Sequence, residues 1–117
     1  MSVMAMNATQ FHRIAKALAD PRRFEVFEKI AAGGDEMCCG AVVKCFPVSQ
    51  ATISHHLKEL ADAGLVEARA EGQFKFFRAR SDVLAAYIEE LQRRTRLSKP
   101  RTQTRTAGTN RSARSAG

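Results

Sequence analysis

Residues 49–66 read SQATISHHLKELADAGLV, and they carry the clearest structural signal in the chain. Ser49 is suited to cap a helix, because its hydroxyl can accept a hydrogen bond from a backbone N–H of the first turn. The apolar residues Ile53, Leu57 and Leu60 fall on one helical face, and Gly64 closes the helix. The stretch therefore predicts a capped amphipathic helix that turns a polar face to solvent.

Two helices are predicted before this stretch, near the start of the chain. Asn7 is placed to cap the first one, and Asp20 and Pro21 suit the N-cap and first position of the second. A glycine pair at 33–34 ends the second helix. The apolar stripe expected on the first helix is Phe11, Ile14, Ala15 and Leu18, and on the second it is Phe24, Phe27, Ile30 and Ala31.

A short third helix is predicted from Cys38 to Cys45, with Val42 and Cys45 facing inward. Pro47 prevents its continuation, so residues 46–48 form a tight turn before the Ser49 cap. A short helix, a tight turn and a capped helix make a helix-turn-helix arrangement.

Beyond Gly64 the apolar period changes from about four to two. Residues 65–70 and 74–80 alternate as strands do, and Gly72 suits the tip of the hairpin between them. Ser81 is placed to cap a last helix. The expected fold is mainly α with a β-hairpin wing: four helices, the fourth being the recognition helix, then two strands and a fifth helix.

Positive charge is concentrated at the C-terminal end of the chain. The formal net charge is +7, and residues 91–117 carry eight basic and no acidic side chains. We expect one domain over residues 1–97 and a disordered basic tail over 98–117, which lacks apolar periodicity. The tail either adds salt-dependent, non-specific DNA affinity or only solubilises the protein. The rest of the chain is nearly neutral, so its bulk charge does not argue for DNA binding.

No apolar run approaches the length of a membrane span, and residues 1–10 lack the features of a signal peptide. We therefore expect a cytoplasmic protein with no membrane partner. In that compartment the three cysteines are expected to be free thiols.

The polar face of the 50–63 helix is suited to the major groove of double-stranded DNA. On the hairpin, Arg69 and Lys75 are candidates for phosphate contacts, and Lys75 is expected to point outward, opposite Phe74 and Phe76. An ordinary solvated helix face and hairpin would show the same residue types. His56 flanks the apolar face, as a packing histidine does. The helix candidates for DNA contact are Ser49, Gln50, Thr52, Ser54, His55 and Lys58.

Three stretches resemble the arsenic-repressor-like (ArsR/SmtB) family of winged-helix regulators: residues 17–24, 49–60 and 63–66. The similarity covers roughly residues 9–95. It implies a homodimeric repressor, built largely from its first and last helices, that leaves an imperfect palindrome when an inducer binds. The alternative is that both helical stripes cover only their own core. The implied dimer residues are Phe11, Ile14, Leu18, Leu84, Tyr87, Ile88 and Leu91.

The same resemblance implies two possible kinds of metal site. The zinc or nickel site on paired last helices needs histidines there, and this chain has none in that helix. The arsenic site resembles Glu-Leu-Cys-Val-Cys-Asp-Leu, and residues 36–42 here read EMCCGAV. Cys38 matches the first cysteine, whereas Gly40 stands in place of the second.

Cys38, Cys39 and Cys45 are therefore the candidate ligands for a thiophilic inducer, As(III) or Sb(III), and no other cofactor is expected. Two alternatives stay open. The thiols respond to oxidants or persulfide, or Cys45 is a small core residue and the adjacent pair has no role.

Two other classes of function fit the residues less well. An enzyme with Cys38 or Cys39 as its nucleophile lacks a suitably placed base, so no catalytic residue is predicted. A winged-helix module that binds protein or RNA is the remaining class, and the polar face around Gln50 and Thr52 argues against it.

Overall fold

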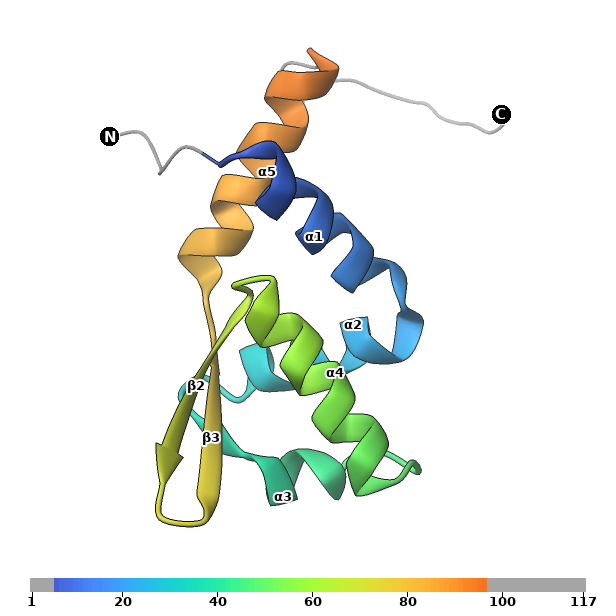
Figure 1. Cartoon of the computed structure of the whole chain (residues 1–117), viewed down its shortest axis with the longest axis vertical. Coiled ribbons are helices and arrows are strands. Elements are labelled where there is room, and N and C mark those ends of the chain that lie inside the picture. The colour runs from blue at the N-terminus through green and yellow to red at the C-terminus, as the bar shows by residue number, and fades with distance from the viewer. Residues whose placement is uncertain (1–5, 97–117) are drawn as a thin grey trace, which may run out of the picture.

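The computed structural model describes residues 6–96, and Figure 1 shows their arrangement. It confirms the winged helix-turn-helix fold, with a hairpin wing between the recognition helix and the last helix. The predicted tail at 98–117 lies outside the described residues. The elements are α1 (Ala8–Ala19), α2 (Pro21–Ala32), β1 (Met37–Cys38), α3 (Cys39–Val43), α4 (Gln50–Asp62), β2 (Val66–Glu71), β3 (Phe74–Ala79) and α5 (Ser81–Thr95).

Side-chain caps start three of the helices as predicted. Asn7, Asp20 and Ser49 each accept a hydrogen bond from the backbone N–H three residues on, at 2.8, 3.0 and 3.1 Å. Each bond satisfies an N–H that the first helical turn leaves without a partner. The predicted cap at Ser81 is wrong, because Ser81 is already helical and Arg80 holds the N-cap position without a side-chain bond.

The buried face of α2 differs from the expected stripe. Val26, Phe27 and Ile30 are buried, whereas Phe24 and Ala31 are exposed. The reason is tertiary: α1, α4 and β3 all pack on α2, and they meet the face centred on Val26 and Ile30. Periodicity along the helix does not choose between two overlapping faces.

The wing contains a third strand that the sequence did not predict. The antiparallel sheet has the order β1-β3-β2, and Met37 and Cys38 pair with Phe77 and Phe76 of β3. The third helix, expected from roughly Cys38, begins one residue later, at Cys39. A two-residue strand is too short to show an alternating pattern.

Val42 of α3 is fully buried, as predicted, but Cys45 is not a core residue. Cys45 is exposed just after α3, and its thiol donates a hydrogen bond to the Ala41 carbonyl oxygen at 3.3 Å. Because α3 ends at Val43, Cys45 is not part of the helix, and helical spacing does not turn it toward the core.

One core joins the helices to the base of the wing. α1 and α5 lie together at one end of the molecule, while α3, α4 and the wing extend toward the other (Figure 1). None of the helices in the described part of the chain is long and apolar enough to cross a membrane. The largest fully buried side chains are Ile14, Ile30, Ile53, Leu57, Leu60, Leu65, Val26 and Val42.

Candidate nucleic-acid interface

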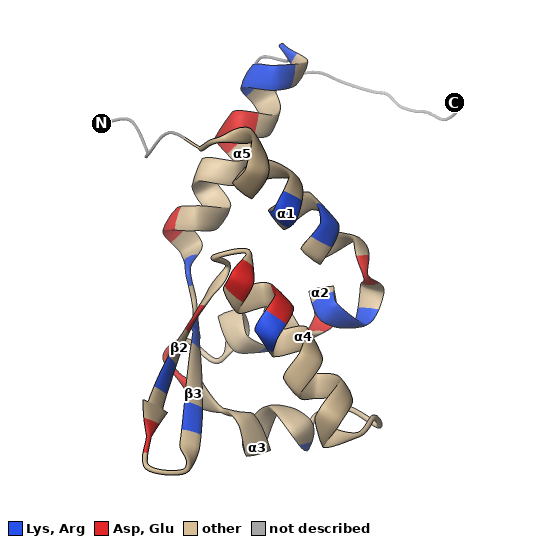
Figure 2. Ribbon diagram, viewed as in Figure 1, with Lys and Arg blue, Asp and Glu red and all other residues tan. Residues whose placement is uncertain are grey.

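The solvent face of α4 is polar, and its N-terminal half is uncharged. Ile53, Leu57 and Leu60 are buried on its inner face, as predicted. In Figure 2 the N-terminal half of α4 carries no charged residue, and charges gather on its C-terminal half and on the wing. Neutral hydrogen-bonding groups are what base edges in the major groove pair with. The exposed candidates on this face are Gln50, Thr52, Ser54, His55 and Lys58.

The start of α4 is held in place by two bonds between Ser49 and Thr52. The Ser49 hydroxyl accepts from the Thr52 N–H at 3.1 Å and donates to the Thr52 hydroxyl at 3.0 Å. Gln50 and Ala51, which begin the first turn, are exposed. A helix N-terminus of this kind attracts a phosphate, because its N–H groups and dipole favour negative charge.

His56 is a packing histidine, as predicted. It is buried on α4, and its Nδ1 accepts a hydrogen bond from the Arg23 Nε of α2 at 3.4 Å. Burial lowers the pKa of His56 and outweighs the nearby carboxylate of Asp20, which acts in the opposite direction. The neutral imidazole therefore links α2 to the recognition helix.

Arg69 lies on the outer face of the wing within a cluster of carboxylates. It donates to both Glu36 carboxylate oxygens, at 2.8 and 2.7 Å, and to Glu71 at 2.7 Å. Its guanidinium also lies 4.6 Å from the centre of the Phe76 ring. The hydrogen bond from Arg69 lowers the pKa of Glu36, and the two carboxylates raise the pKa of Arg69. The charge of Arg69 is thus balanced within the protein.

Lys75 lies opposite Phe74 and Phe76, as expected, but its face of the strand is the one turned toward α4. The buried residue Phe77 shares that face. Lys75 forms no ion pair with any residue that the structure describes. It is therefore available to a ligand that approaches between the wing and α4.

A hollow of about 380 Å³ separates the recognition helix from the wing. Two lysines, Lys58 and Lys75, and the Ser54 hydroxyl stand at its polar positions. Ammonium groups on either side of such a hollow suit the phosphate backbone of a duplex. Its lining residues are Cys39, Ser54, Leu57, Lys58, Ala61, Ala68, Lys75 and Phe77.

Comparisons with known proteins agree with this arrangement. Residues 18–69 match the family model of a helix-turn-helix domain. The chain is 31% identical over 86 residues to the arsenical resistance operon repressor of Staphylococcus aureus, covering 74% of this chain and 81% of that repressor. The chain belongs to the ArsR family. It is a DNA-binding transcription regulator of that family and not an enzyme.

Solved ArsR-family structures share the fold. An ArsR-like regulator from Rhodococcus sp. RHA1 superposes with a TM-score of 0.67 at 25% identity, over 75% of this chain and 81% of that one. The homodimeric winged helix-turn-helix domain Mb0332 from Mycobacterium bovis, a possible ArsR-family regulator, gives 0.60 at 26% identity. That alignment covers 89% of this chain and 100% of the other.

The three cysteines of this ArsR-family regulator are not gathered into one site. Cys38 lies in β1, Cys39 begins α3 and Cys45 follows α3 with its thiol turned to a carbonyl of its own helix. Among residues 6–96 no group of three or more His, Cys, Asp or Glu side chains is placed to hold a metal ion. The three thiols therefore form no ready-made site within residues 6–96, and their role as ligands stays a prediction.

The expected dimer residues of the ArsR-family chain differ in burial. Phe11 and Ile14 are buried in the core of their own chain, and their part in a dimer stays a prediction. Phe11 packs against Tyr87, with ring centres 5.2 Å apart, and under the Arg94 guanidinium at 4.5 Å. Leu18, Leu84 and Tyr87 are half-buried, whereas Ile88 and Leu91 are 48% and 41% exposed.

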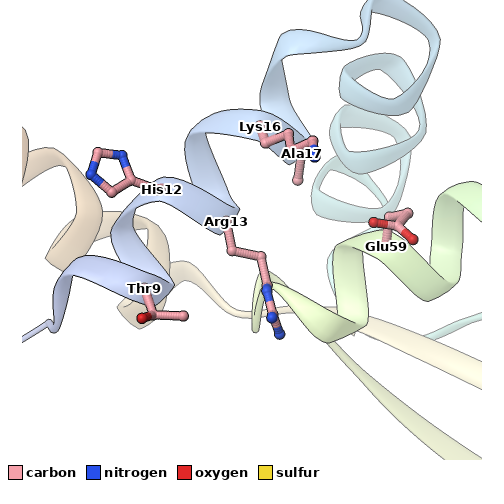
Figure 3. Close-up of a pocket in the computed structure, with 6 residues that line it drawn as sticks. All are labelled: Thr9, His12, Arg13, Lys16, Ala17 and Glu59. Atoms are coloured by element: carbon pink, nitrogen blue, oxygen red, sulfur yellow. The ribbon is translucent and has the colours of Figure 1, made fainter.

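A second hollow, of about 350 Å³, lies between α1 and the C-terminal half of α4. His12, Arg13 and Lys16 of α1 and Glu59 of α4 give it a mixed charge (Figure 3). Arg13 also donates to a backbone carbonyl near the end of α4, at 3.5 Å. This hollow is at the opposite end of α4 from Ser49, outside the predicted DNA interface.

Two residues of the interface were not expected from the sequence: Arg23, which holds His56, and Glu36, which holds Arg69. Both contacts join residues 33 positions apart. Arg23 lies within residues 17–24, a stretch that resembles the family, and this resemblance could have marked it as a functional residue. Nothing in the local pattern around Glu36 indicates its partner.

Proposed function

We propose that this chain is a homodimeric repressor that binds a palindromic operator and is released by an inducer. The observation that carries the proposal is the exposed, neutral polar face of α4, which begins at the Ser49 cap. An apolar pair on α5, Ile88 and Leu91, supports the dimer, since exposed neighbouring apolar side chains suit a two-fold contact. The homodimeric Mycobacterium bovis relative points the same way.

The polar residues of the interface have different roles. Gln50, Thr52, Ser54 and His55 read base edges. The Thr52 hydroxyl accepts from Ser49, so its own proton and its methyl group stay available to a base. Ser49, Lys58 and Lys75 hold phosphates. Arg69 holds the wing together and is not a principal DNA contact, since two carboxylates already occupy its donors.

We further propose that the inducer is a thiophilic ion, As(III) or Sb(III), bound by the cysteines. Cys38 and Cys39 are adjacent in sequence and supply two soft ligands. Recruiting Cys45 requires its thiol to leave the Ala41 carbonyl and α3 to unwind. Because α3 packs against α4, unwinding would displace the recognition helix. Oxidation or persulfide formation at the same thiols is the alternative, and a cytoplasmic location stays a prediction.

Fluorescence anisotropy with a labelled duplex from the upstream region of the chain's own gene tests the proposal. Reduced protein is expected to bind tightly against non-specific competitor, and Gln50→Ala to lose that preference. Binding no tighter than to unrelated duplexes would contradict the proposal. Release by arsenite that is lost in single Cys→Ser variants would support the metalloid inducer, and binding indifferent to arsenite would overturn that part alone.

A further inference from the structure

The hollow between α4 and the wing has a floor that DNA binding does not explain. Its rim is polar and carries Lys58 and Lys75, which suit a phosphate. Its floor is apolar: Ala61 and Ala68 present the accessible surface, above Leu57 and Phe77, which are almost fully buried. A phosphate is fully hydrophilic and gains nothing from an apolar floor.

The size and lining of this hollow match a small-molecule site. Its volume of about 380 Å³ falls within the roughly 300–1,000 Å³ of ligand pockets. Such pockets combine a mainly apolar lining with a few polar groups that orient the ligand. By contrast, the hollow between α1 and α4 has Ala17 as its one apolar side chain (Figure 3), so it lacks a comparable floor.

The charge at the rim selects the kind of ligand. Lys75 forms no ion pair with a described residue, and Lys58 pairs with Asp62 at 2.9 Å on an exposed surface. Exposed pairs of this kind are weak, so a second carboxylate can join Lys58 at little cost. Two ammonium groups above an apolar floor are complementary to one carboxylate attached to an apolar body.

We propose that this hollow binds a small organic carboxylate with an apolar body, and that the bound molecule competes with DNA for Lys58 and Lys75. The inference rests on the proposed repressor function and gives it a second inducer class, with a site separate from thiolate chemistry. Release is direct: the apolar body packs on the accessible surface of Ala61 and Ala68, above Leu57 and Phe77, while the carboxylate takes the position of a backbone phosphate. No movement of α3 and no cysteine chemistry is required.

Hydrocinnamate serves as the probe, and hydrocinnamyl alcohol is its neutral counterpart of the same shape. Amide chemical shifts of the full chain are followed without DNA. Saturable shifts are expected around Leu57, Ala68 and Phe77, with the alcohol binding about tenfold more weakly than the acid. Shifts that do not saturate, or that lie elsewhere on the molecule, would overturn the site.

A matched pair of variants tests the location. Ala68→Leu places extra volume in the hollow, and Ala70→Leu makes the same change two residues along β2, on the same strand face but outside the hollow. Both alanines are exposed, so both variants are expected to fold. Hydrocinnamate affinity should fall about tenfold in Ala68→Leu and stay within about twofold in Ala70→Leu. Equal affinity in both variants would overturn the proposal.

The Cys39 thiol, which lines the hollow, gives a second readout. With Cys38 and Cys45 replaced by serine, hydrocinnamate should slow alkylation of Cys39 severalfold, and an unchanged rate would count against the site. DNA competition is measured last, by anisotropy. If the duplex binds selectively but hydrocinnamate leaves the shifts unchanged, the site fails and the repressor stands. If hydrocinnamate binds and no duplex is preferred, the repressor function fails instead.

Discussion

The guanidinium of Arg69 donates to both carboxylate oxygens of Glu36, at 2.8 and 2.7 Å, across 33 residues of sequence. This contact joins β2 of the wing to the segment that leads into Cys38. Glu71 and the Phe76 ring hold the same guanidinium from other sides. The wing therefore has a fixed outer face, and the lysine that remains free for DNA is on the face toward α4.

Replacing Arg69 and Lys75 separates the two faces of the wing. Arg69→Met is expected to lower the thermal midpoint and to leave the salt dependence of operator binding unchanged, because its charge is already balanced. Lys75→Met should reduce the slope of log K against log salt by about one unit, since one phosphate contact is lost. Anisotropy titrations at several salt concentrations measure both slopes. Equal reductions in the two variants would refute the assignment.

Ser49 is expected to have two roles that substitution can separate. Ser49→Ala removes the cap of α4 and should destabilise the protein by about 1 kcal/mol in denaturant unfolding. Ser49→Asp keeps a capping oxygen, so it should largely restore stability, but its negative charge should weaken DNA binding.

Ser54 provides the control for this pair of variants. It lies on the same exposed face, where no cap depends on it, so Ser54→Ala should leave stability within about 0.5 kcal/mol. If Ser49→Asp binds the operator as tightly as the natural chain, the helix N-terminus does not approach a phosphate.

His56 should make stability depend on pH near neutrality. Burial holds its folded pKa below the ordinary 6.5, so the unfolded chain binds the proton more readily. The stability from the neutral imidazole is full above 6.5 and is lost as the pH falls from there through the folded pKa. His56→Gln should therefore flatten the change in unfolding free energy between about pH 7 and about pH 5.5.

The neighbouring exposed histidine supplies the comparison. His55→Gln is expected to retain most of the pH dependence of the natural chain, because burial is the main cause of the lowered pKa of His56 and the charge of His55 is a smaller one. Chemical denaturation at a series of pH values measures the effect. The prediction fails if both variants behave alike.

The proposed dimer depends on the exposed side of α5. Ile88→Glu replaces one residue of the apolar pair with a charged one and should convert the protein to a monomer. The monomer should still fold, because Ile88 is 48% exposed in the single chain. Phe74→Glu makes the same kind of change at another exposed apolar residue, on the wing, and should leave the mass unchanged. Light scattering on a sizing column measures the mass. A dimeric Ile88→Glu would place the interface elsewhere.

Local chemistry made much of the fold predictable. Asn7, Asp20 and Ser49 are recognisable caps because a short polar side chain bonds a backbone N–H three residues away, within the same segment. The buried set Ile53, Leu57 and Leu60 follows from helical period, and the hairpin follows from strand period with Gly72 at positive φ. These features depend on neighbours in sequence, so the sequence by itself determined them.

Contacts between distant segments decided the rest. Which face of α2 is buried, the pairing of Cys38 with Phe76, and the placement of Phe11 under Arg94 all depend on elements brought together by folding. Ion pairs could not be predicted for the same reason. Arg69 and Lys75 are both basic residues of the wing, but only Arg69 pairs with Glu36. The physical reason is that periodicity and capping act over one or two turns, whereas burial and ion pairing depend on which segments meet in the folded chain.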